Sequence, residues 1–269
     1  MITDIPPLGL GTYGRTGTTG VAALLTAIEI GYRHLDTAQS YDTESTVGAA
    51  VRQSGLPRSA FFVTTKVADT ALDRRCFLPS VEKSLATLDI GPVDLLLIHW
   101  PSYGDAVPLD HYLDALAQAQ QRGLTRRIGV SNFPGAFLDR SIALLGPGLI
   151  ATNQVEIHPY MQSPKLCAHA RAVGVHLTAY QPLAKGRVGS DPVLTALADR
   201  HGVSAAAIAL AFLMAEGHCP IPASSNEAHL RANFAALGVA LATHEVEAIR
   251  RLDKGMRLIN PVKSPDWDD

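Results

Sequence analysis

The stretch DLLLIHW, residues 94–100, shows the pattern that decides the fold of this chain. Four successive apolar residues end in a histidine and a tryptophan, and a short apolar run of this kind is typical of a strand buried on both faces of a sheet. Similar runs, bounded by Gly, Pro or polar residues, occur on either side: PLGLGT (7–12), YRHLDT (32–37), FFVTTK (61–66), RRIGVSN (126–132), ATNQVEI (151–157), GVHLTAY (174–180) and HCPIPAS (218–224). We predict eight buried parallel strands.

Amphipathic stretches with helical spacing lie between these runs. The predicted helices cover 18–30, a segment starting near Thr43, a segment beginning at Pro79 (79–90), 109–123, 133–146, 163–174, 203–217 and 226–238. Several of them end in Gly, a common C-terminal stop. Eight strands alternating with helices predict an α/β chain folded as a (β/α)8 TIM barrel, with residues 1–269 forming a single domain.

Composition narrows the classes of function and the expected location. The formal net charge is −2, and the Lys and Arg residues are scattered, so we expect no nucleic-acid partner. The three cysteines, Cys76, Cys167 and Cys219, are far apart and form no zinc or redox motif. No stretch resembles a signal peptide or is apolar enough to span a membrane. We therefore expect a cytoplasmic protein without a membrane partner or a bound metal.

Polar residues occur at or just past the ends of the predicted strands. In a barrel of this type the chemistry lies at the C-terminal ends of the strands, where the βα loops meet. One polar residue at a strand end is usually a cap or a turn former, but a set drawn from most of the strands indicates an active site. The set is Thr12, Asp36, Lys66, His99, Asn132, Gln154 and Tyr180.

A glycine pattern near the N-terminus offers a different reading. Gly9, Gly11 and Gly14 match the G-x-G-x-x-G fingerprint of dinucleotide-binding folds, and Asp36 follows at about the expected spacing. A doubly wound fold would leave Lys66 and His99 without a role. We therefore favour the alternative, in which Gly9 and Gly11 allow close packing of the first strand and Gly11 and Thr12 approach a ligand.

Four residues form a possible acid–base set: Asp36, Tyr41, Lys66 and His99. The ordinary pKa of tyrosine, about 10, is too high for efficient proton exchange near neutral pH, and we expect the Lys66 ammonium to lower the pKa of Tyr41. A lysine at a buried rim needs a carboxylate partner, which Asp36 can supply. His99 could polarise a substrate carbonyl oxygen. Taken singly, a surface Tyr41, a solvated Lys66 or a core His99 are the more ordinary interpretations.

The chain resembles the aldo-keto reductase family over essentially its whole length. The matching motifs are GLGTY, GYRHLDTAQSYDTESTVG, TTK, SLATLDIGPVDLLLIHWP, IGVSNF, NQVEIHPY, AYQPLAKG and IPASSNEAHLRANF, in the order of the family. Among family members it is most similar to the bacterial 2,5-diketo-D-gluconate and methylglyoxal reductases. The resemblance implies an NADP(H)-dependent oxidoreductase in which hydride passes from the nicotinamide to a carbonyl carbon and Tyr41 donates the proton, with Asp36, Lys66 and His99 completing the catalytic set.

The resemblance also implies a cofactor site along the barrel rim. Ser131, Asn132 and Gln154 match the residues that bind the nicotinamide carboxamide, and Tyr180 matches the aromatic residue stacked on its ring. Gln181 and Leu183 occupy positions that follow the pyrophosphate. The remaining predicted contacts are Gly11 and Thr12, the helix start at Ser224, Ser225 and Asn226 with the neighbouring His229, and the adenine-contacting Asn233.

Two departures from the family pattern concern the adenosine 2′-phosphate. Ala223 replaces the usual Lys and His229 replaces the usual Arg, so two charge-assisted contacts are lost. We expect NADPH as cofactor with NADH use possible, and Lys185, Arg187 or Arg231 are candidates for compensation. Residues 1–6 are too few for the hairpin that usually plugs the bottom of this barrel. We therefore expect that hairpin to be shortened or absent and another element to cover the bottom.

Tyr13 and Trp100 flank the predicted site and are candidate substrate-binding walls together with His99, although Trp100 could equally be rim packing. The short loop 102–110 predicts an open pocket for small or polar carbonyl compounds, and we expect the tail 259–269 to be the other lid. Two other functions stay open: a nicotinamide-binding redox sensor without significant turnover, and a barrel aldolase using Lys66 as Schiff-base nucleophile. A monomer is the expected state.

Overall fold

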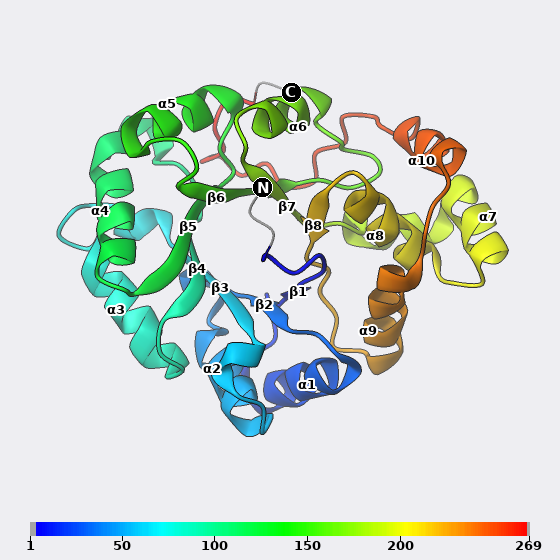
Figure 1. Cartoon of the computed structure of the whole chain (residues 1–269), viewed down its shortest axis with the longest axis horizontal. Helices are drawn as coiled ribbons and strands as arrows, with labels where there is room; N and C mark the ends of the chain where they lie inside the picture. The colour runs from blue at the N-terminus through cyan, green and yellow to red at the C-terminus, as the bar shows by residue number, and fades with distance from the viewer. Residues whose placement is uncertain (1–3, 268–269) are drawn as a thin grey trace.

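The computed structural model describes residues 4–267, which form one ring of eight parallel strands surrounded by helices (Figure 1). The strands follow one another around the ring in chain order, as expected for a (β/α)8 barrel. All eight predicted strands are present: β1 (Leu10–Gly11), β2 (His34–Asp36), β3 (Phe62–Val67), β4 (Val93–Ile98), β5 (Thr125–Ser131), β6 (Ile150–Glu156), β7 (His176–Tyr180) and β8 (His218–Pro220).

Backbone hydrogen bonds between the first and last strands complete the ring. The N–H groups of Gly9 and Gly11 donate to the carbonyl oxygens of Pro220 and Pro222, at 3.0 and 2.9 Å. Those prolines have no N–H to return, so their own backbone adds no donor to this ladder. A Cβ on Gly9 would lie 2.7 Å from the His34 ring and 2.8 Å from Ile221. The glycines therefore permit close packing, and the dinucleotide-fingerprint alternative is excluded by the strand order.

Most predicted helices are present with small changes of boundary. The α-helices are α1 (Gly17–Ile30), α2 (Glu44–Gln53), α3 (Phe77–Leu88), α4 (Leu109–Gln121), α5 (Gly135–Leu145), α6 (Pro164–Ala172), α7 (Pro192–His201), α8 (Ala205–Ala215), α9 (Glu227–Phe234) and α10 (Thr243–Arg250). Helix α3 begins two residues before Pro79, which still lies in its first turn. Sequence reasoning missed α7 and α10, although Asp191 caps α7 by accepting the N–H groups of Val193 and Leu194.

The N-terminal segment itself covers the bottom of the barrel, and no hairpin occurs in the part of it that the structure describes, residues 4–9 (Figure 1). Ile5 is buried against inward-facing side chains that include Phe62 and Cys219, and Cys219 Sγ lies 3.0 Å from the Pro6 carbonyl oxygen. Asp4 pairs with Arg127. The prediction of a missing hairpin is therefore confirmed for these residues, but the expectation that another element takes its place is wrong.

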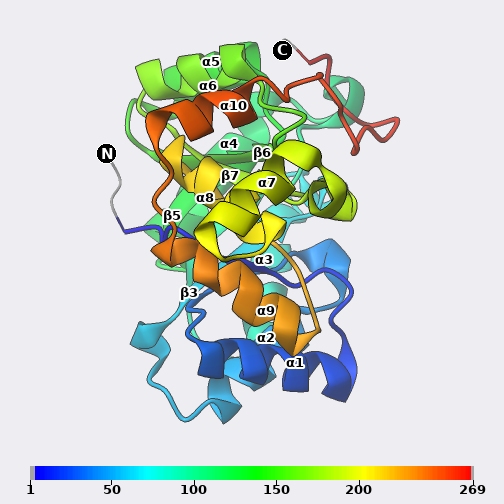
Figure 2. The same cartoon turned by 90° about the vertical axis from the view of Figure 1, so that its right-hand side faces the viewer.

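The other end of the barrel carries the strand C-termini and the chain's C-terminal tail. Figure 2 shows the N-terminal segment and the tail on opposite sides of the barrel. Within residues 4–267 no single helix is long and apolar enough to cross a membrane. Helices α7 and α8 reach the necessary length and apolar composition only when they are counted together, and the chain bends by 93° between them.

Candidate active site

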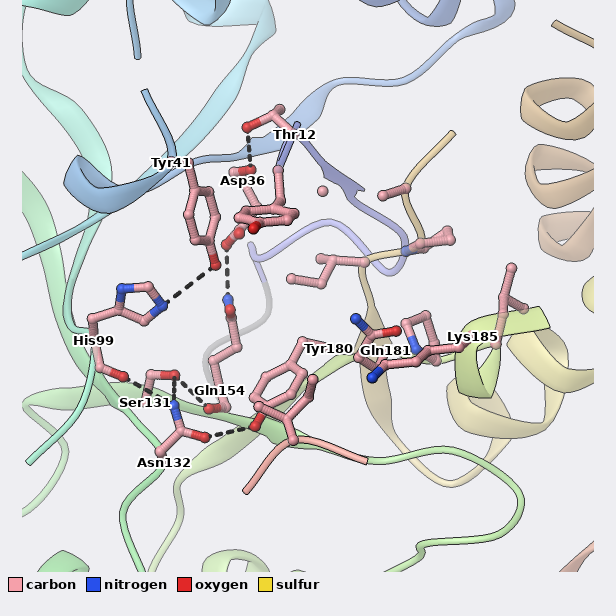
Figure 3. A pocket seen from close by; sticks show the side chains of 18 of the residues that line it. Thr12, Asp36, Tyr41, His99, Ser131, Asn132, Gln154, Tyr180, Gln181 and Lys185 are labelled. Carbon is pink, nitrogen blue, oxygen red and sulfur yellow. Dashed lines mark hydrogen bonds between the residues drawn. The ribbon is translucent and has the colours of Figure 1, made fainter. Parts of the chain in front are cut away.

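A cavity of about 540 Å³ opens at the C-terminal ends of the strands, and most of the predicted site residues line it (Figure 3). We call it the first cavity. Every strand or the loop after it contributes to its wall except β3, whose predicted residue, Lys66, lies buried behind Asp36 and Tyr41. The predicted residues that line it are Gly11, Thr12, Tyr13, Asp36, Tyr41, His99, Trp100, Ser131, Asn132, Gln154, Tyr180, Gln181, Leu183 and His229.

Lys66 is fully buried and uses its ammonium group entirely within the protein. Its Nζ donates to Asp36 Oδ1 at 2.5 Å, to the Thr37 carbonyl oxygen at 2.9 Å and to the Tyr41 hydroxyl at 3.5 Å. An ammonium has three N–H donors, so all of them are occupied. Burial by itself lowers the pKa of Lys66, but Asp36 and Tyr41 outweigh it and raise the pKa above its usual value. Lys66 is therefore a fixed cation, which disfavours the Schiff-base alternative because that chemistry needs a neutral amine.

Tyr41 ends the short 3-10 helix η1 (Gln39–Tyr41) and directs its hydroxyl into the first cavity. The hydroxyl lies 3.4 Å from His99 Nε2, and the Tyr13 ring packs edge-on against the Tyr41 ring at 5.2 Å. The predicted direction of its pKa shift is wrong. Burial is the largest influence and raises the pKa of Tyr41, and although Lys66 opposes it, the pKa stays above 10. The phenol therefore remains protonated at neutral pH.

His99 follows β4 and is neutral at any ordinary pH. Burial, with smaller contributions from Lys66 and Lys263, lowers the pKa of His99 to about 2. The Ser40 hydroxyl lies 3.3 Å from Nδ1 and can donate to it. That bond favours the tautomer with the proton on Nε2, the nitrogen that faces the Tyr41 hydroxyl. His99 can thus offer a neutral N–H to an oxygen atom placed beside Tyr41.

A second group of polar side chains continues from Asp36 along β5, β6 and β7 (Figure 3). Gln154 Nε2 donates to Asp36 Oδ2 at 2.7 Å, so the carboxylate binds Lys66 with one oxygen and Gln154 with the other. Asn132 Nδ2 donates to the His99 carbonyl oxygen at 2.9 Å, and its Oδ1 accepts from the Tyr180 hydroxyl at 2.8 Å. These bonds join the predicted acid–base set and the predicted nicotinamide contacts into one network.

A second cavity, of about 490 Å³, shares Leu183, Gly186, Ala223 and His229 with the first and so continues the same groove. Ser224 and Asn233 line it as predicted, whereas Ser225 and Asn226 line neither cavity. Asn226 instead caps α9, because its Oδ1 accepts the N–H of His229 at 3.1 Å. One of the helix N–H groups expected to face an anion is therefore already occupied.

The aromatic residues predicted to contact substrate lie at the mouth of the first cavity. Trp100 is buried with 6% of its surface exposed and lines the cavity, so it is more than rim packing, whereas Tyr13 is 68% exposed. The C-terminal tail passes beside Trp100: the Trp100 and Trp267 rings lie 6.4 Å apart, and Ile259 lines the cavity. The tail thus covers part of the mouth as predicted, with Asp268 and Asp269 outside the described residues.

Sequence reasoning missed residues whose roles depend on distant partners. The Thr37 carbonyl oxygen binds Lys66, and Ser40 faces His99. Both belong to the motif GYRHLDTAQSYDTESTVG, residues 31–48, but nothing in their spacing marks them. Asp199 of α7 lines the second cavity, and this helix itself was not predicted. Within residues 4–267 there is no group of three or more His, Cys, Asp or Glu side chains placed to bind a metal ion.

Comparison with known proteins agrees with the geometry. Residues 7–254 match the model of the aldo/keto reductase family. The chain is 41% identical to methylglyoxal reductase DkgB of Salmonella typhi over 98% of this chain and 99% of that one. A crystal structure assigned as a 2,5-diketo-D-gluconic acid reductase B has a TM-score of 0.94 at 40% identity, covering 98% of this chain and 94% of that one.

A Bombyx mori aldo-keto reductase solved in complex with NADP has a TM-score of 0.89 at 32% identity, covering 98% of this chain and 94% of that one. The resemblance inferred from the motifs is therefore confirmed along nearly the whole chain. This chain belongs to the aldo/keto reductase family, the NADP-dependent oxidoreductases that reduce carbonyl groups.

Proposed function

We propose that this protein reduces small aldehydes and ketones, with Tyr41 as the proton donor at a site completed by Asp36, Lys66 and His99. The observation that carries the proposal is the position of the Tyr41 hydroxyl. It faces the first cavity between the charged Nζ of Lys66 and the neutral Nε2 of His99, at 3.5 and 3.4 Å. A general acid needs this combination of access to substrate and a stabilised conjugate base.

The four side chains have separate parts in the proposed reaction. A nicotinamide cofactor held in the groove would supply hydride to the carbonyl carbon. The Tyr41 hydroxyl gives its proton to the carbonyl oxygen as negative charge develops there. Lys66 stabilises the phenolate that remains, and Asp36 keeps the Lys66 ammonium charged and in place. The Nε2–H of His99 donates a hydrogen bond to the substrate oxygen, which orients the carbonyl toward Tyr41.

The groove formed by the two cavities suits a dinucleotide. At its inner end Gln154 uses Nε2 for Asp36, which leaves Oε1 to accept from a carboxamide N–H. Ser131 and Asn132 lie beside it, and the Tyr180 ring forms a wall against which the nicotinamide would stack. Gln181, Leu183 and Gly186 follow along the groove toward Ser224 and Asn233 in the second cavity. We assign these residues to the cofactor in that order, with Gly11 and Thr12 on the facing wall.

We propose NADPH as the usual donor, in keeping with the family, and NADH as a substitute because the adenosine end lacks the usual cations. The described residues lining the second cavity include no Lys or Arg, but they do include the Asp199 carboxylate. Of the candidates for compensation, Arg231 pairs with Glu227 at 2.8 Å, and Lys185 lines the first cavity instead. Arg187 lines neither. A carboxylate can accept from a ribose 2′-hydroxyl but repels a 2′-phosphate, so the usual advantage of NADPH is reduced here.

The first cavity suits a small polar carbonyl compound. Trp100 and Tyr13 form apolar walls, while His99 and Tyr41 supply the polar contacts. The proteins named above that resemble this chain act on methylglyoxal or 2,5-diketo-D-gluconate according to their names. We propose dicarbonyls and keto sugars of this size as the substrate class.

The test is to follow nicotinamide absorbance with methylglyoxal, 2,5-diketo-D-gluconate and a panel of simple aldehydes, using NADPH and NADH in parallel. We expect turnover with the dicarbonyls and with both cofactors. Cofactor affinity is measured separately by quenching of protein fluorescence. Tight cofactor binding without turnover of any carbonyl compound would instead support the redox-sensing alternative.

A further inference from the structure

The buried carboxylate of Glu156 has no part in the proposed reaction. Glu156 ends β6, two residues beyond Gln154, and is fully buried. The described residues that line the first cavity do not include it, so it does not face the substrate. Its nearest bonded partners belong to its own loop and to the chain's C-terminal tail, about 100 residues further along the sequence.

Three N–H groups converge on this carboxylate. The backbone N–H of Leu258 donates to Oε1 at 2.6 Å, and the backbone N–H of Ile259 donates to Oε2 at 2.8 Å. His158 Nε2 lies 3.0 Å from Oε1. The backbone N–H of Tyr160 donates to His158 Nδ1, which places the ring proton on Nε2 and makes it the donor to Glu156. A buried carboxylate without such donors is strongly unfavourable, so detachment of the tail would remove two of its three.

The tail beyond this contact forms part of the cavity mouth. Ile259 lines the first cavity, and Trp267 packs against Trp100 and is covered by the Arg257 guanidinium at 3.8 Å from its ring centroid. At the far side Lys263 pairs with Asp69 in the β3–α3 loop at 2.8 Å, between partly exposed side chains. Lys185 Nζ also donates to the Leu258 carbonyl oxygen at 3.4 Å. Among these attachments of the tail, the contact with Glu156 involves a buried carboxylate and the one with Asp69 is more exposed.

Glu156 binds the tail through backbone N–H groups and not through a charged side chain. Glu156 lies close enough to Arg257 to raise its pKa against the larger lowering by burial, but both bonds from the tail to Glu156 come from backbone N–H groups. Backbone recognition does not depend on which side chains the tail carries. The match to the family model ends at Lys254, just before this contact.

We propose that Glu156, with its partner His158, is a positioning residue that docks the C-terminal tail by its backbone and thereby sets the substrate-facing wall at Ile259 and Trp100. Glu156 touches neither substrate nor cofactor, and it acts on substrate binding through the tail. The inference about substrate binding rests on the proposed carbonyl reduction, whereas the docking itself does not.

The docking is tested by amide hydrogen exchange at Leu258 and Ile259 and by acrylamide quenching of tryptophan fluorescence. The chain contains only two tryptophans, and Trp267→Phe isolates the signal of Trp100. In Glu156→Ala we expect exchange at both amides to rise by at least tenfold and Trp100, measured in the Trp267→Phe background, to become more accessible to quencher. Glu156→Gln keeps one carbonyl acceptor and should show a smaller change. The matched control is Lys263→Met, which removes the Asp69 ion pair and the ammonium 5.9 Å from the Trp100 ring centroid. It leaves the contacts of Glu156 intact and should leave exchange at 258–259 unchanged.

The effect on substrate is tested by steady-state kinetics of the same variants. We expect the KM for dicarbonyls to rise about tenfold in Glu156→Ala, with kcat and the Kd of NADPH within about twofold of the wild-type values. Wild-type exchange and quenching in Glu156→Ala would refute the docking. If Glu156→Ala does not fold, Glu156→Gln serves the same test, and wild-type exchange there would equally refute it.

Detached tails with an unchanged KM for every carbonyl tested would refute the role in substrate binding but leave the docking in place. Absence of turnover in the wild-type protein would refute the proposed function, and the exchange and quenching measurements would still decide whether Glu156 docks the tail.

Discussion

The two ends of the groove, around Tyr41 in the first cavity and around His229 in the second, differ in burial and in charge. Around Tyr41, all three N–H donors of Lys66 bind protein atoms. Asp36 accepts from Lys66 with one oxygen and from Gln154 with the other. Around His229 the residues 225–229 are exposed, although Ser224 and Asn233 are buried, and the local cation Arg231 is paired with Glu227.

This difference indicates that the exact placement of side chains matters more near Tyr41 than near His229. Hydrogen bonds in a buried network are strong and fix the donor beside the reacting oxygen before substrate arrives. The exposed end can accept variation, because contacts to the far end of a cofactor change its affinity without changing the geometry of the reaction. We therefore expect substitutions near Tyr41 to lower kcat and substitutions near His229 to alter cofactor affinity.

The largest effect is expected from Tyr41→Phe, which removes the proposed proton donor and keeps the ring. A positioned general acid contributes roughly 10²–10⁴-fold to a rate, so kcat should fall by about that factor. The Kd of NADPH, measured by fluorescence quenching, should stay within about twofold. Wild-type turnover in this variant would show that another group donates the proton.

Lys66→Met should lower activity and also stability. It leaves the buried Asp36 carboxylate without its cation, and removal of one partner of such a pair costs about 3–5 kcal/mol. Urea unfolding measures this loss. The double variant Lys66→Met/Asp36→Asn removes both charges and should recover most of the stability while remaining inactive. If stability is unchanged in the single variant, the pair is not an essential part of the buried network.

A comparison of Gln154→Leu with Ser131→Ala separates two parts of the nicotinamide end. Of these two residues, only Gln154 donates a hydrogen bond to Asp36. The Ser131 hydroxyl instead donates to the Gln154 backbone carbonyl oxygen at 2.7 Å. A hydrogen bond to a charged group contributes about 1.5–3 kcal/mol, so Gln154→Leu should lower kcat by about tenfold or more. Ser131→Ala should mainly weaken NADPH binding. Equal effects on kcat would mean that Gln154 serves the cofactor alone.

Restoring the usual cations at the adenosine end tests how the protein distinguishes NADPH from NADH. Ala223→Lys combined with His229→Arg should raise NADPH affinity by about tenfold, since each new charge-assisted bond contributes about 1.5–3 kcal/mol before its ordering cost. NADH affinity should change by less than about twofold, and kcat should not change. Fluorescence titrations with both cofactors measure this. An unchanged NADPH affinity would place the 2′-phosphate elsewhere.

The smallest effect is expected from pH. Burial first, and then Lys66 and Lys263, keep the pKa of His99 at about 2, while burial raises that of Tyr41 above 10. Neither group changes charge between about pH 6 and pH 9, so kcat for reduction should be nearly constant there. It should fall only as the pH rises through the raised pKa of Tyr41. A loss of kcat near neutral pH would require a different acid.

The sequence predicted most of the fold because local patterns specify it. Apolar runs such as DLLLIHW identified the strands, and their alternation with helical patterns identified the barrel. Helices α7 and α10 were missed because they contain fewer apolar residues than α8, whose residues are all apolar and mostly buried. The N-terminal cover was also missed, because Ile5 gains its contacts only from residues of distant strands.

The candidate site was predictable to the extent that strand ends converge in a barrel. That rule brought Asp36, Lys66 and His99 together with Tyr41, but it could not give the direction of the Tyr41 pKa shift. The shift depends on a balance between burial and the Lys66 charge, and burial is a property of the folded chain.

By itself the sequence determined the family, the barrel and the residue types around Tyr41, since each of these follows from local periodicity and motif order. Only the tertiary structure decided which oxygen of Asp36 meets Gln154, which nitrogen of His99 faces Tyr41, and that Glu156 binds a tail about 100 residues away. Those contacts depend on side-chain direction and on burial across the barrel rim, and neither is encoded in any short stretch of the chain.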